Sequence, residues 1–288
     1  MQRVAQISVE LDSTPGCVTL VRAMLSATSE TLGFAPELLD DLKTAVSEAC
    51  NNVVVHAYEG GVGPLTVALD VRDGTVEVVI RDQGKGIQQL TPSEERMGVG
   101  LAVMSALSDR VEFTGASGGG TEVRLEFSGR SFERAVSSEE PAPALGELPG
   151  SDELPDQSLS GYISVTLTPV GLLAGVMGRV ARALAASTSF SFDRFSDIYL
   201  ISDAIAAHAE RAASAGWISF ALDADDGKLE LSVGPLRSGS GVRLEEEAGP
   251  AHPRSPLGIL VDELIVERGE QAETLRVVLG DRRDEAVG

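Results

Sequence analysis

The fold of the N-terminal half is decided by the segment Glu48-Ala49-Cys50-Asn51-Asn52-Val53-Val54-Val55-His56-Ala57. It ends a stretch, residues 37–57, in which apolar residues recur every three or four positions, and this period predicts a long amphipathic helix. Glu48 and Asn52 are four residues apart, so both side chains lie on one helix face, away from the apolar stripe. A carboxylate beside an amide oxygen suits Mg²⁺, which takes few protein ligands when it also binds phosphates. A solvated helix face without function has the same spacing.

The sequence around this helix predicts an α+β fold, a two-layer sandwich in which helices cover one face of a mixed sheet. Alternating apolar residues at Ile7, Val9 and Leu11 predict a first strand. Beyond the long helix, apolar alternation and glycine-containing turns predict a hairpin, a short helix and a second pair of strands. The elements expected after the first strand are helices at 18–32 and 37–57, strands at 65–71 and 76–81, a helix at 99–108, and strands at 110–114 and 121–127.

A second motif, Asp82-Gln83-Gly84-Lys85-Gly86-Ile87, follows the strand expected at 76–81. A carboxylate at the end of a strand can accept a hydrogen bond from an exocyclic amine, such as that of adenine. The two glycines allow the backbone to approach a flat ring and to adopt unusual dihedral angles. Taken alone, this pattern is equally typical of an ordinary turn.

A third motif, Arg96-Met97-Gly98-Val99-Gly100-Leu101, opens the helix expected at 99–108. Glycines before a helix expose backbone amides beside the positive end of the helix dipole, which favours phosphate binding. Arg96 adds a fork of donors for a terminal phosphate. Thr121, which follows three glycines, is a candidate hydroxyl near a bound base, and an ordinary strand threonine is the alternative.

In this order, the motifs resemble the ATP-binding fold shared by gyrase, Hsp90, histidine kinases and MutL, the GHKL (Bergerat) superfamily. Within it, residues 1–128 are similar to the anti-sigma-factor serine kinases of bacteria, the SpoIIAB and RsbW group. The residues that carry the resemblance are Ala45-Val46-Ser47-Glu48-Ala49, His56-Ala57-Tyr58, Glu95-Arg96-Met97-Gly98-Val99-Gly100-Leu101 and Leu107-Ser108-Asp109.

The resemblance implies ATP and Mg²⁺ as cofactors and a role for each site residue. Glu48 would be the general base that activates a serine hydroxyl on a partner protein, and Asn52 would hold Mg²⁺ beside the nucleotide. Asp82 would bind the adenine amine, and Thr121 would help to seat the base. Arg96 would face the γ-phosphate. The pocket would be shaped by Gly84, Gly86, Gly98, Gly100 and Leu101.

One departure from the family concerns the lid, the segment between Ile87 and Arg96. It has only eight residues, which is shorter than is usual in this group. A short lid closes less completely over the phosphates, so we expect it to affect turnover more than nucleotide binding.

The chain divides at an acidic, proline-rich segment, residues 129–160, which has few large apolar residues. Such a composition cannot offset the entropy lost on ordering, so it predicts a flexible linker, and an acidic segment with its own function is the alternative. The expected organisation is an ATP-binding domain at 1–128, the linker, a second domain at 161–282 and a tail at 283–288.

The two halves share sequence features at a nearly constant spacing, which predicts a duplicated unit of about 125 residues. An unrelated fold for the second half is the alternative. The matched pairs are Ile7-Ser8-Val9 with Ile163-Ser164-Val165, Val46-Ser47-Glu48-Ala49 with Ile201-Ser202-Asp203-Ala204, Leu69-Asp70-Val71-Arg72-Asp73-Gly74 with Leu222-Asp223-Ala224-Asp225-Asp226-Gly227, and residues 121–125 with 274–278.

The second copy lacks the polar residues of the first, which predicts a degenerate pseudo-ATPase that serves as a scaffold or interaction partner. This alignment puts Asp203 at the position of Glu48, Ala207 at that of Asn52 and Pro235 at that of Asp82. Leu257-Gly258-Ile259 keeps one glycine of the phosphate loop. Because related kinases are often homodimers, we expect either an internal pseudo-dimer or a homodimer.

Composition excludes several classes of function. The formal net charge is −21 and the isoelectric point is about 4.5, which disfavours binding to nucleic acids and to anionic membranes. Two cysteines and three histidines, without metal-ligand spacing, predict neither a disulfide framework nor a zinc site. The N-terminus lacks the layout of a signal peptide, so we expect a cytoplasmic protein.

The sequence therefore predicts an ATP-dependent protein serine/threonine kinase that acts as an anti-sigma factor in transcription regulation. Its expected partners are a sigma factor and an anti-anti-sigma protein with the STAS fold, which it would phosphorylate on serine. The alternative is a nucleotide-gated protein-binding switch without useful phosphotransfer. A histidine-kinase fragment is disfavoured because no dimerisation helix with a phosphorylatable histidine precedes the motifs.

Overall fold

The computed structural model describes residues 3–86, 99–115, 119–129, 148, 162–188, 190–225, 227–248 and 256–281. The chain divides into two compact units, Met1–Ala142 and Pro143–Gly288. The division falls inside the segment expected to be a linker. Apart from Gly129 and Leu148, that segment lies outside the described residues, as does the tail at 283–288, so the domain bounds stay a prediction.

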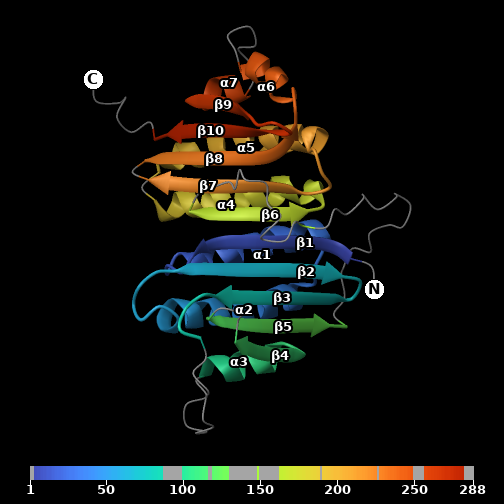
Figure 1. Ribbon diagram of the computed structural model, residues 1–288, viewed down its shortest axis with the longest axis vertical. Coiled ribbons are helices and arrows are strands. Elements are labelled where there is room, and N and C mark those ends of the chain that lie inside the picture. Colours follow the sequence, from blue (N-terminus) through green and yellow to red (C-terminus); the bar gives the residue numbers. More distant parts are fainter. Residues whose placement is uncertain are drawn as a thin grey trace. The chain divides into compact units, whose positions relative to one another are not determined.

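The helices and strands of the first unit follow the order expected from its sequence (Figure 1). From α1 to β5, the expected bounds agree with the structure to within one residue. The elements are β1 (Arg3–Asp12), α1 (Cys17–Leu32), α2 (Pro36–His56), β2 (Pro64–Arg72), β3 (Thr75–Asp82), α3 (Val99–Leu107), β4 (Arg110–Gly115) and β5 (Thr121–Ser128).

The described strands of the first unit follow the order β4-β5-β3-β2-β1, and every neighbouring pair is antiparallel. The expectation of a mixed sheet was therefore wrong. Two successive helices, α1 and α2, connect β1 to β2, so the chain returns to the end of the sheet where β1 finished and β2 runs back beside it. A single crossover helix would have given a parallel pair.

The core of the first unit lies between the sheet and α1 and α2, which lie behind the sheet in Figure 1. Alternate residues of β1 are buried, and α2 buries one stripe along its length. Each fully buried aliphatic side chain contributes about 1.5–3 kcal/mol relative to an exposed one. The buried residues of α2 are Leu38, Leu42, Ala45, Val46, Ala49, Cys50 and Val53.

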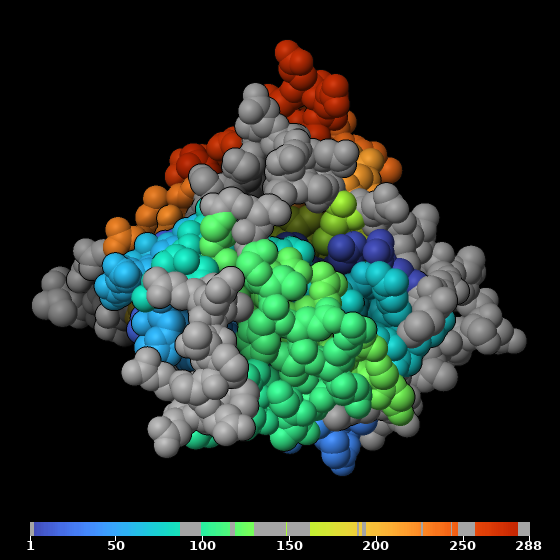
Figure 2. Space-filling view, turned by 60° about the horizontal axis from the view of Figure 1, so that its bottom comes forward, coloured from blue at the N-terminus to red at the C-terminus, as the bar shows by residue number. Residues whose placement is uncertain are grey.

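Helix α3 is apolar on most of its surface, yet Met104 is its one buried residue. Val99 at its start is 82% exposed, and Phe113 on the neighbouring edge strand β4 is 39% exposed. Figure 2 looks onto this end of the first unit, with α3 and β4 in green. The helix lies against α2, and that contact brings its glycine-containing first turn beside the side chains of α2.

Cys17 and Cys50 are both buried in the first unit as free thiols. Burial raises the pKa of the Cys17 thiol to about 11. Burial, with a smaller contribution from Cys17, raises the pKa of Cys50 as well. Both thiols therefore remain protonated at neutral pH and behave as small core residues.

The second unit has the same succession of elements, with a short 3₁₀ turn before its first helix and two short helices in place of α3 (Figure 1). Its elements are β6 (Ile163–Thr168), η2 (Val170–Leu172), α4 (Leu173–Ser187), α5 (Phe192–Ala212), β7 (Ile218–Asp225), β8 (Lys228–Arg237), α6 (Gly241–Ala248), α7 (Pro256–Leu260), β9 (Glu263–Arg268) and β10 (Ala272–Gly280).

The described strands of the second unit follow the order β6-β7-β8-β10-β9, which matches β1-β2-β3-β5-β4 element by element. The pairing register matches too, since Ile7 lies opposite Leu69 and Ile163 lies opposite Leu222. Topology and register are thus common to both units, while the duplication itself stays a prediction.

Burial corrects the expected alignment of the long helices. Adding 156 to the number of each buried residue of α2 gives a buried residue of α5. By this match Ala204 lies at the position of Glu48 and His208, which is 7% exposed, lies at that of Asn52. Asp203 and Ala207, which the sequence put at these positions, are exposed and one residue away.

The last strand and the short helix also need correction. Leu125 lies opposite Val78 and Val277 lies opposite Leu231, so the match of residues 121–125 with 274–278 was displaced by one residue. Leu257 and Met104 are each buried and each lie six residues before the following strand. Gly258 is therefore not at a phosphate-loop position, and the equivalents of that loop fall among residues 249–255, outside the described part of the chain.

A buried arginine, Arg194, joins several elements of the second unit. It lies at the position in α5 that matches Leu38 in α2. Arg194 is 2% exposed, and its guanidinium donates to the carbonyl oxygens of Gly280 (2.8 Å) and Leu260 (3.0 Å). It also donates to the carboxylates of Asp197 (3.0 Å) and Asp262 (3.1 Å). The charge is therefore matched by acceptors from α5 and from the ends of α7 and β10.

Among the described residues, the segment Val170–Ser187 is long and apolar enough to cross a membrane by length and composition. Half of it is buried inside the second unit, on the side of α4 that carries Leu173, Val176, Met177 and Val180. A core helix of a globular domain has the same properties.

Candidate functional site

The carboxylate of Glu48 lies against the first turn of α3. A Cβ atom added to Gly100 would lie 2.2 Å from Glu48 Oε1 and 2.9 Å from its Cδ, so the carboxylate occupies the space that a side chain at position 100 would need. Glu48 is half-buried, and Asn52 lies one helical turn further along the same face of α2, also half-buried. Leu101 follows in α3 and is half-buried as well.

Asp82 ends β3 and is 5% exposed. One of its oxygens, Oδ1, accepts a hydrogen bond from the backbone N–H of Gly84 at 2.8 Å. This short turn fixes the orientation of the carboxylate and leaves the second oxygen as an acceptor.

The loop after β3 is enclosed by close backbone contacts that only glycine allows. A Cβ atom on Gly84 would lie 2.2 Å from the carbonyl oxygen of Ala57 at the end of α2. Gly86 has φ +72° and would bring a Cβ to 3.0 Å from the carbonyl oxygen of Gly120. Gly120 has φ +88°, and a Cβ atom on it would lie 2.0 Å from the carbonyl oxygen of Asp82. The loop therefore lies between the end of α2 and the turn that precedes β5.

Thr121 lies beside Asp82 in the sheet. The ladder between β3 and β5 ends at the pair Arg81 and Glu122, and Asp82 and Thr121 are the residues directly beyond that pair. A Cβ atom on Gly120, the residue before Thr121, would lie 2.0 Å from the carbonyl oxygen of Asp82. The residue expected to bind an exocyclic amine and the residue expected to seat the base are thus neighbours.

Tyr58 connects this loop to two other elements. Its hydroxyl accepts a hydrogen bond from the backbone N–H of Gln83 at 2.8 Å and donates one to the carbonyl oxygen of Pro64 at 2.5 Å. Burial, and to a lesser degree the charge of Asp82, raises the pKa of Tyr58 against the effect of the Gln83 hydrogen bond. Sequence reasoning used Tyr58 as one letter of a motif and missed these contacts, which join residues far apart in the chain.

The structure therefore brings the described candidate residues to one end of the first unit's sheet, where α2, the end of β3, the start of β5 and the first turn of α3 meet. Arg96, Gly98 and the short lid lie outside the described residues. Within the described part of the chain, no group of three or more His, Cys, Asp or Glu residues could hold a metal ion alone. A Mg²⁺ ion at Asn52 would depend on nucleotide phosphates for most of its ligands.

The corresponding end of the second unit is built differently. Gly234 lies opposite Ser219 as Arg81 lies opposite Thr66, so Pro235 stands where Asp82 does, as the sequence predicted. Gly239, with φ +82°, lies four residues after Pro235, as Gly86, with φ +72°, lies four residues after Asp82. The position of Thr121 is taken by Glu273, because Glu273 lies opposite Arg268 as Thr121 lies opposite Gly115.

Glu273 fills this end of the second unit with its own carboxylate. The side chain is 3% exposed, and its two oxygens accept hydrogen bonds from the backbone N–H groups of Gly239 (2.7 Å) and Gly241 (2.8 Å). Arg268 Nε lies 3.8 Å from the carboxylate. Burial alone would raise the pKa of Glu273, but the two amides and Arg268 outweigh it and hold the pKa below its usual value.

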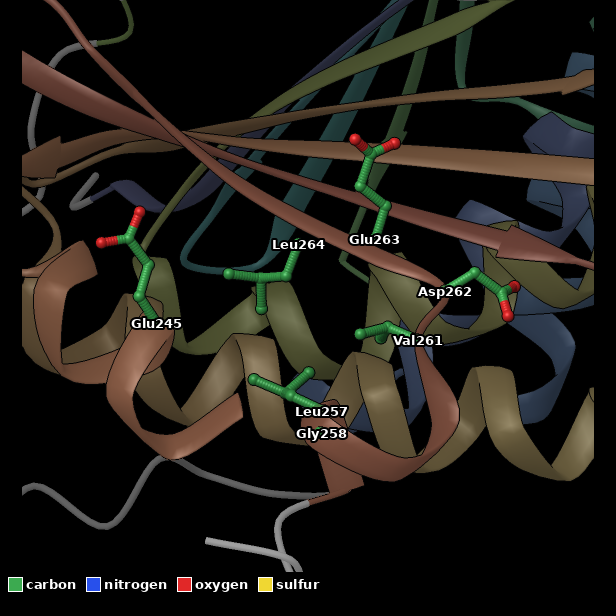
Figure 3. Close-up of a pocket in the computed structure, with 7 residues that line it drawn as sticks. All are labelled: Glu245, Leu257, Gly258, Val261, Asp262, Glu263 and Leu264. Atoms are coloured by element: carbon green, nitrogen blue, oxygen red, sulfur yellow. The ribbon is translucent and has the colours of Figure 1, made fainter. Parts of the chain in front are cut away.

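A pocket of about 340 Å³ lies elsewhere in the second unit, between α6, α7 and β9 (Figure 3). The side chains of Leu257 and Leu264 point towards each other, while the carboxylates of Glu245 and Glu263 point away. Glu245 is bound by Arg268, and Asp262 by Arg194. The carboxylates of Glu245 and Asp262 are therefore engaged in structural ion pairs. The pocket contains none of the residues expected to bind a nucleotide.

Comparisons with known proteins match the first unit, which carries the candidate site. The family model for the histidine kinase-like ATPase domain matches residues 11–127. The anti-sigma F factor of Caldanaerobacter subterraneus is 33% identical over an alignment 124 positions long, which covers 39% of this chain and 87% of that protein. The serine-protein kinase RsbW of Bacillus velezensis is 33% identical over an alignment 130 positions long, which covers 40% of this chain and 81% of that protein.

Among solved structures, the RsbU and RsbW domains of a Mycobacterium tuberculosis protein are 26% identical, cover 43% of this chain and 32% of their own, and give a TM-score of 0.35. The match to the family model defines the first unit as a GHKL-type ATPase domain, as predicted. The chain belongs to the family of the anti-sigma F factors and RsbW serine-protein kinases.

Proposed function

We propose that this chain is an ATP- and Mg²⁺-dependent serine protein kinase that acts as an anti-sigma regulatory factor. The observation that carries the proposal is the contact of the Glu48 carboxylate with Gly100, which puts a potential general base at the first turn of the helix that follows the phosphate-loop motif. Phosphoryl transfer depends mainly on positioning and charge neutralisation, with a base within reach of the nucleophile.

In this proposal Glu48 takes the proton from a serine hydroxyl of the partner while the serine oxygen forms a bond to the γ-phosphorus. The bond from that phosphorus to the β,γ-bridging oxygen breaks, and ADP leaves. Asp82 accepts a hydrogen bond from the adenine amine and Thr121 supports the base. Asn52 would hold Mg²⁺, whose charge neutralises the phosphates. Gly84, Gly86, Gly98, Gly100 and Leu101 would shape the pocket, and Arg96 would face the γ-phosphate.

The proposed protein partners are a sigma factor, which the chain would sequester, and a STAS-fold anti-anti-sigma protein, which it would phosphorylate. The names of the relatives, anti-sigma F factor and serine-protein kinase, support both roles. The net charge of −21 argues that the chain would act through proteins rather than by binding DNA. A cytoplasmic location follows from these partners.

The test is transfer of label from γ-labelled ATP to a purified STAS-fold anti-anti-sigma protein. Glu48→Gln keeps the size of the side chain and removes the base, so we expect labelling to fall by at least about 100-fold, the lower end of what a general base contributes. ATP binding should be nearly unchanged. Glu37→Gln, an exposed residue in the first turn of the same helix, is the matched control.

A second candidate function, a nucleotide-gated protein-binding switch without phosphotransfer, is favoured by the eight-residue lid. It predicts ATP-dependent binding of the sigma factor with no labelled STAS protein, and no effect of Glu48→Gln on that binding. Labelling that depends on Glu48 would eliminate it.

We further propose that the second unit is a degenerate pseudo-ATPase that binds no nucleotide. Pro235 offers no side-chain acceptor for an adenine amine, and the Glu273 carboxylate already accepts hydrogen bonds from the amides of Gly239 and Gly241. Calorimetry should give one ATP per chain, and Asp82→Asn should weaken that binding strongly without revealing a second site. Two ATP per wild-type chain would contradict this proposal.

A further inference from the structure

Tyr58 occupies a junction between three elements of the first unit. It lies two residues after the end of α2, its ring covers Gly63, and its hydroxyl bonds Pro64 at the start of β2. A Cβ atom on Gly63 would lie 2.2 Å from Cε1 of the ring, so the ring is held directly against the backbone. The phenol therefore has a fixed position from which its oxygen reaches Gln83.

The hydrogen bond to Gln83 acts on the residue next to Asp82. Oδ1 of Asp82 accepts from the N–H of Gly84, so the carboxylate takes its orientation from the backbone of residues 82–84. The N–H of Gln83, in the middle of that turn, donates to the Tyr58 oxygen at 2.8 Å. Moving the backbone at Gln83 therefore rotates the carboxylate.

The Tyr58 phenol is in the neutral form that these two hydrogen bonds require. Its oxygen must accept from Gln83 while its proton goes to Pro64, which requires the neutral form. Burial and the nearby charge of Asp82 raise its pKa, so the phenol is neutral throughout the range in which a kinase works. The close contact of Gly84 with Ala57 connects the same turn to the end of α2, the helix of Glu48 and Asn52.

We propose that Tyr58 is a positioning residue that acts through Gln83 to aim the Asp82 carboxylate at the exocyclic amine of the purine, and so sets the preference for a 6-amino base. The inference rests on the proposed function, in which Asp82 binds that amine. Phenylalanine at position 58 would keep the ring on Gly63 and lose both hydrogen bonds, leaving the loop free to rotate away.

The test compares two ligands, ATP and purine riboside 5′-triphosphate, which differ in the 6-amino group. Their Kd values are measured by calorimetry with the full chain. We expect the wild type to bind ATP more tightly. In Tyr58→Phe that preference should fall by about two- to tenfold, the effect of one hydrogen bond, with little change in the Kd of purine riboside 5′-triphosphate. A purely structural defect would weaken both ligands alike and leave their ratio unchanged.

Tyr199→Phe, in the second unit, is the matched control and should leave both Kd values unchanged. Gly63→Ala tests the inference from the other side, because the added methyl pushes the ring and moves the hydroxyl without deleting it. It should also reduce the preference for ATP. Both variants are measured below their melting temperatures, so that a less stable variant still reports on binding.

The outcomes separate the inference from the proposed function. A wild type that does not distinguish the two ligands would overturn the role of Asp82 and the inference together. A wild type that prefers ATP, with the same preference in Tyr58→Phe, would overturn the role of Tyr58 and leave that of Asp82 intact.

Discussion

At the scale of single residues, Gly100 decides where the proposed base can lie. An alanine methyl at this position would be 2.2 Å from Glu48 Oε1, so the carboxylate would have to swing away. Alanine is also a better helix former than glycine, which keeps α3 stable. We expect Gly100→Ala to lower the single-turnover rate of phosphotransfer at least about tenfold. Gly115→Ala, whose methyl would meet nothing within 4 Å, is the control. A wild-type rate in Gly100→Ala would show that the position of Glu48 is not critical.

The carboxylate of Asp82 gives a second prediction at this scale. In Asp82→Asn the oxygen bonded to Gly84 can be kept, but the other becomes an NH₂ donor that faces the donor amine of adenine. We expect the Kd of ATP to rise by at least about tenfold, since a buried polar contact becomes an unsatisfied one. Calorimetry measures the change, with Asp73→Asn in the exposed turn after β2 as the control. Normal ATP binding by Asp82→Asn would refute the assignment.

The positions of Glu48, Asn52 and Asp82 could be predicted because each belongs to a local pattern, a helix face or a strand end. The hydrogen bonds and close contacts around these side chains could not be predicted, since they join residues far apart in the chain. Tyr58 is paired with Gln83, 25 residues away, and Glu273 with Gly239, 34 residues away. Nothing in the neighbouring sequence marks either residue as more than a strand or helix-end side chain.

At the scale of elements, periodicity predicted where helices and strands lie, because an apolar stripe repeats many times within one element. It did not predict the strand directions, because these depend on the path of the chain through the two helices that connect one strand to the next. It also misaligned α5 by one residue, since similar letters were matched instead of the buried stripe. A buried Arg194 at the position of Leu38 interrupts that stripe, and its acceptors come from Gly280, Leu260 and Asp262.

The Glu273 carboxylate, which accepts a hydrogen bond from Gly241 at the start of α6, leads to a prediction about the stability of that helix start. The pKa of this carboxylate is held below the usual 4.5, so it stabilises the fold above that pH, and the contribution is lost as the pH falls through the lowered pKa. We expect hydrogen exchange at the amides of Gly239 and Gly241 to be protected at pH 7 and to approach that of Glu273→Gln as the pH falls below 4.5. Glu263→Gln is the control. Protection that does not differ between wild type and Glu273→Gln at pH 7 would contradict this assignment.

At the scale of the whole molecule, each unit buries its own core, and the described residues of the candidate nucleotide site all belong to the first unit. The chain cut after Ala142 should therefore fold and bind ATP with a Kd within about threefold of the full chain, a change of less than 1 kcal/mol. In the described part of the second unit, Pro235 and Ala204 stand at the positions that match Asp82 and Glu48, so we expect its removal to change partner binding or assembly instead. Circular dichroism, calorimetry and light scattering on both chains measure fold, ATP binding and mass. A fragment that is folded but binds no ATP would show that the second unit completes the site.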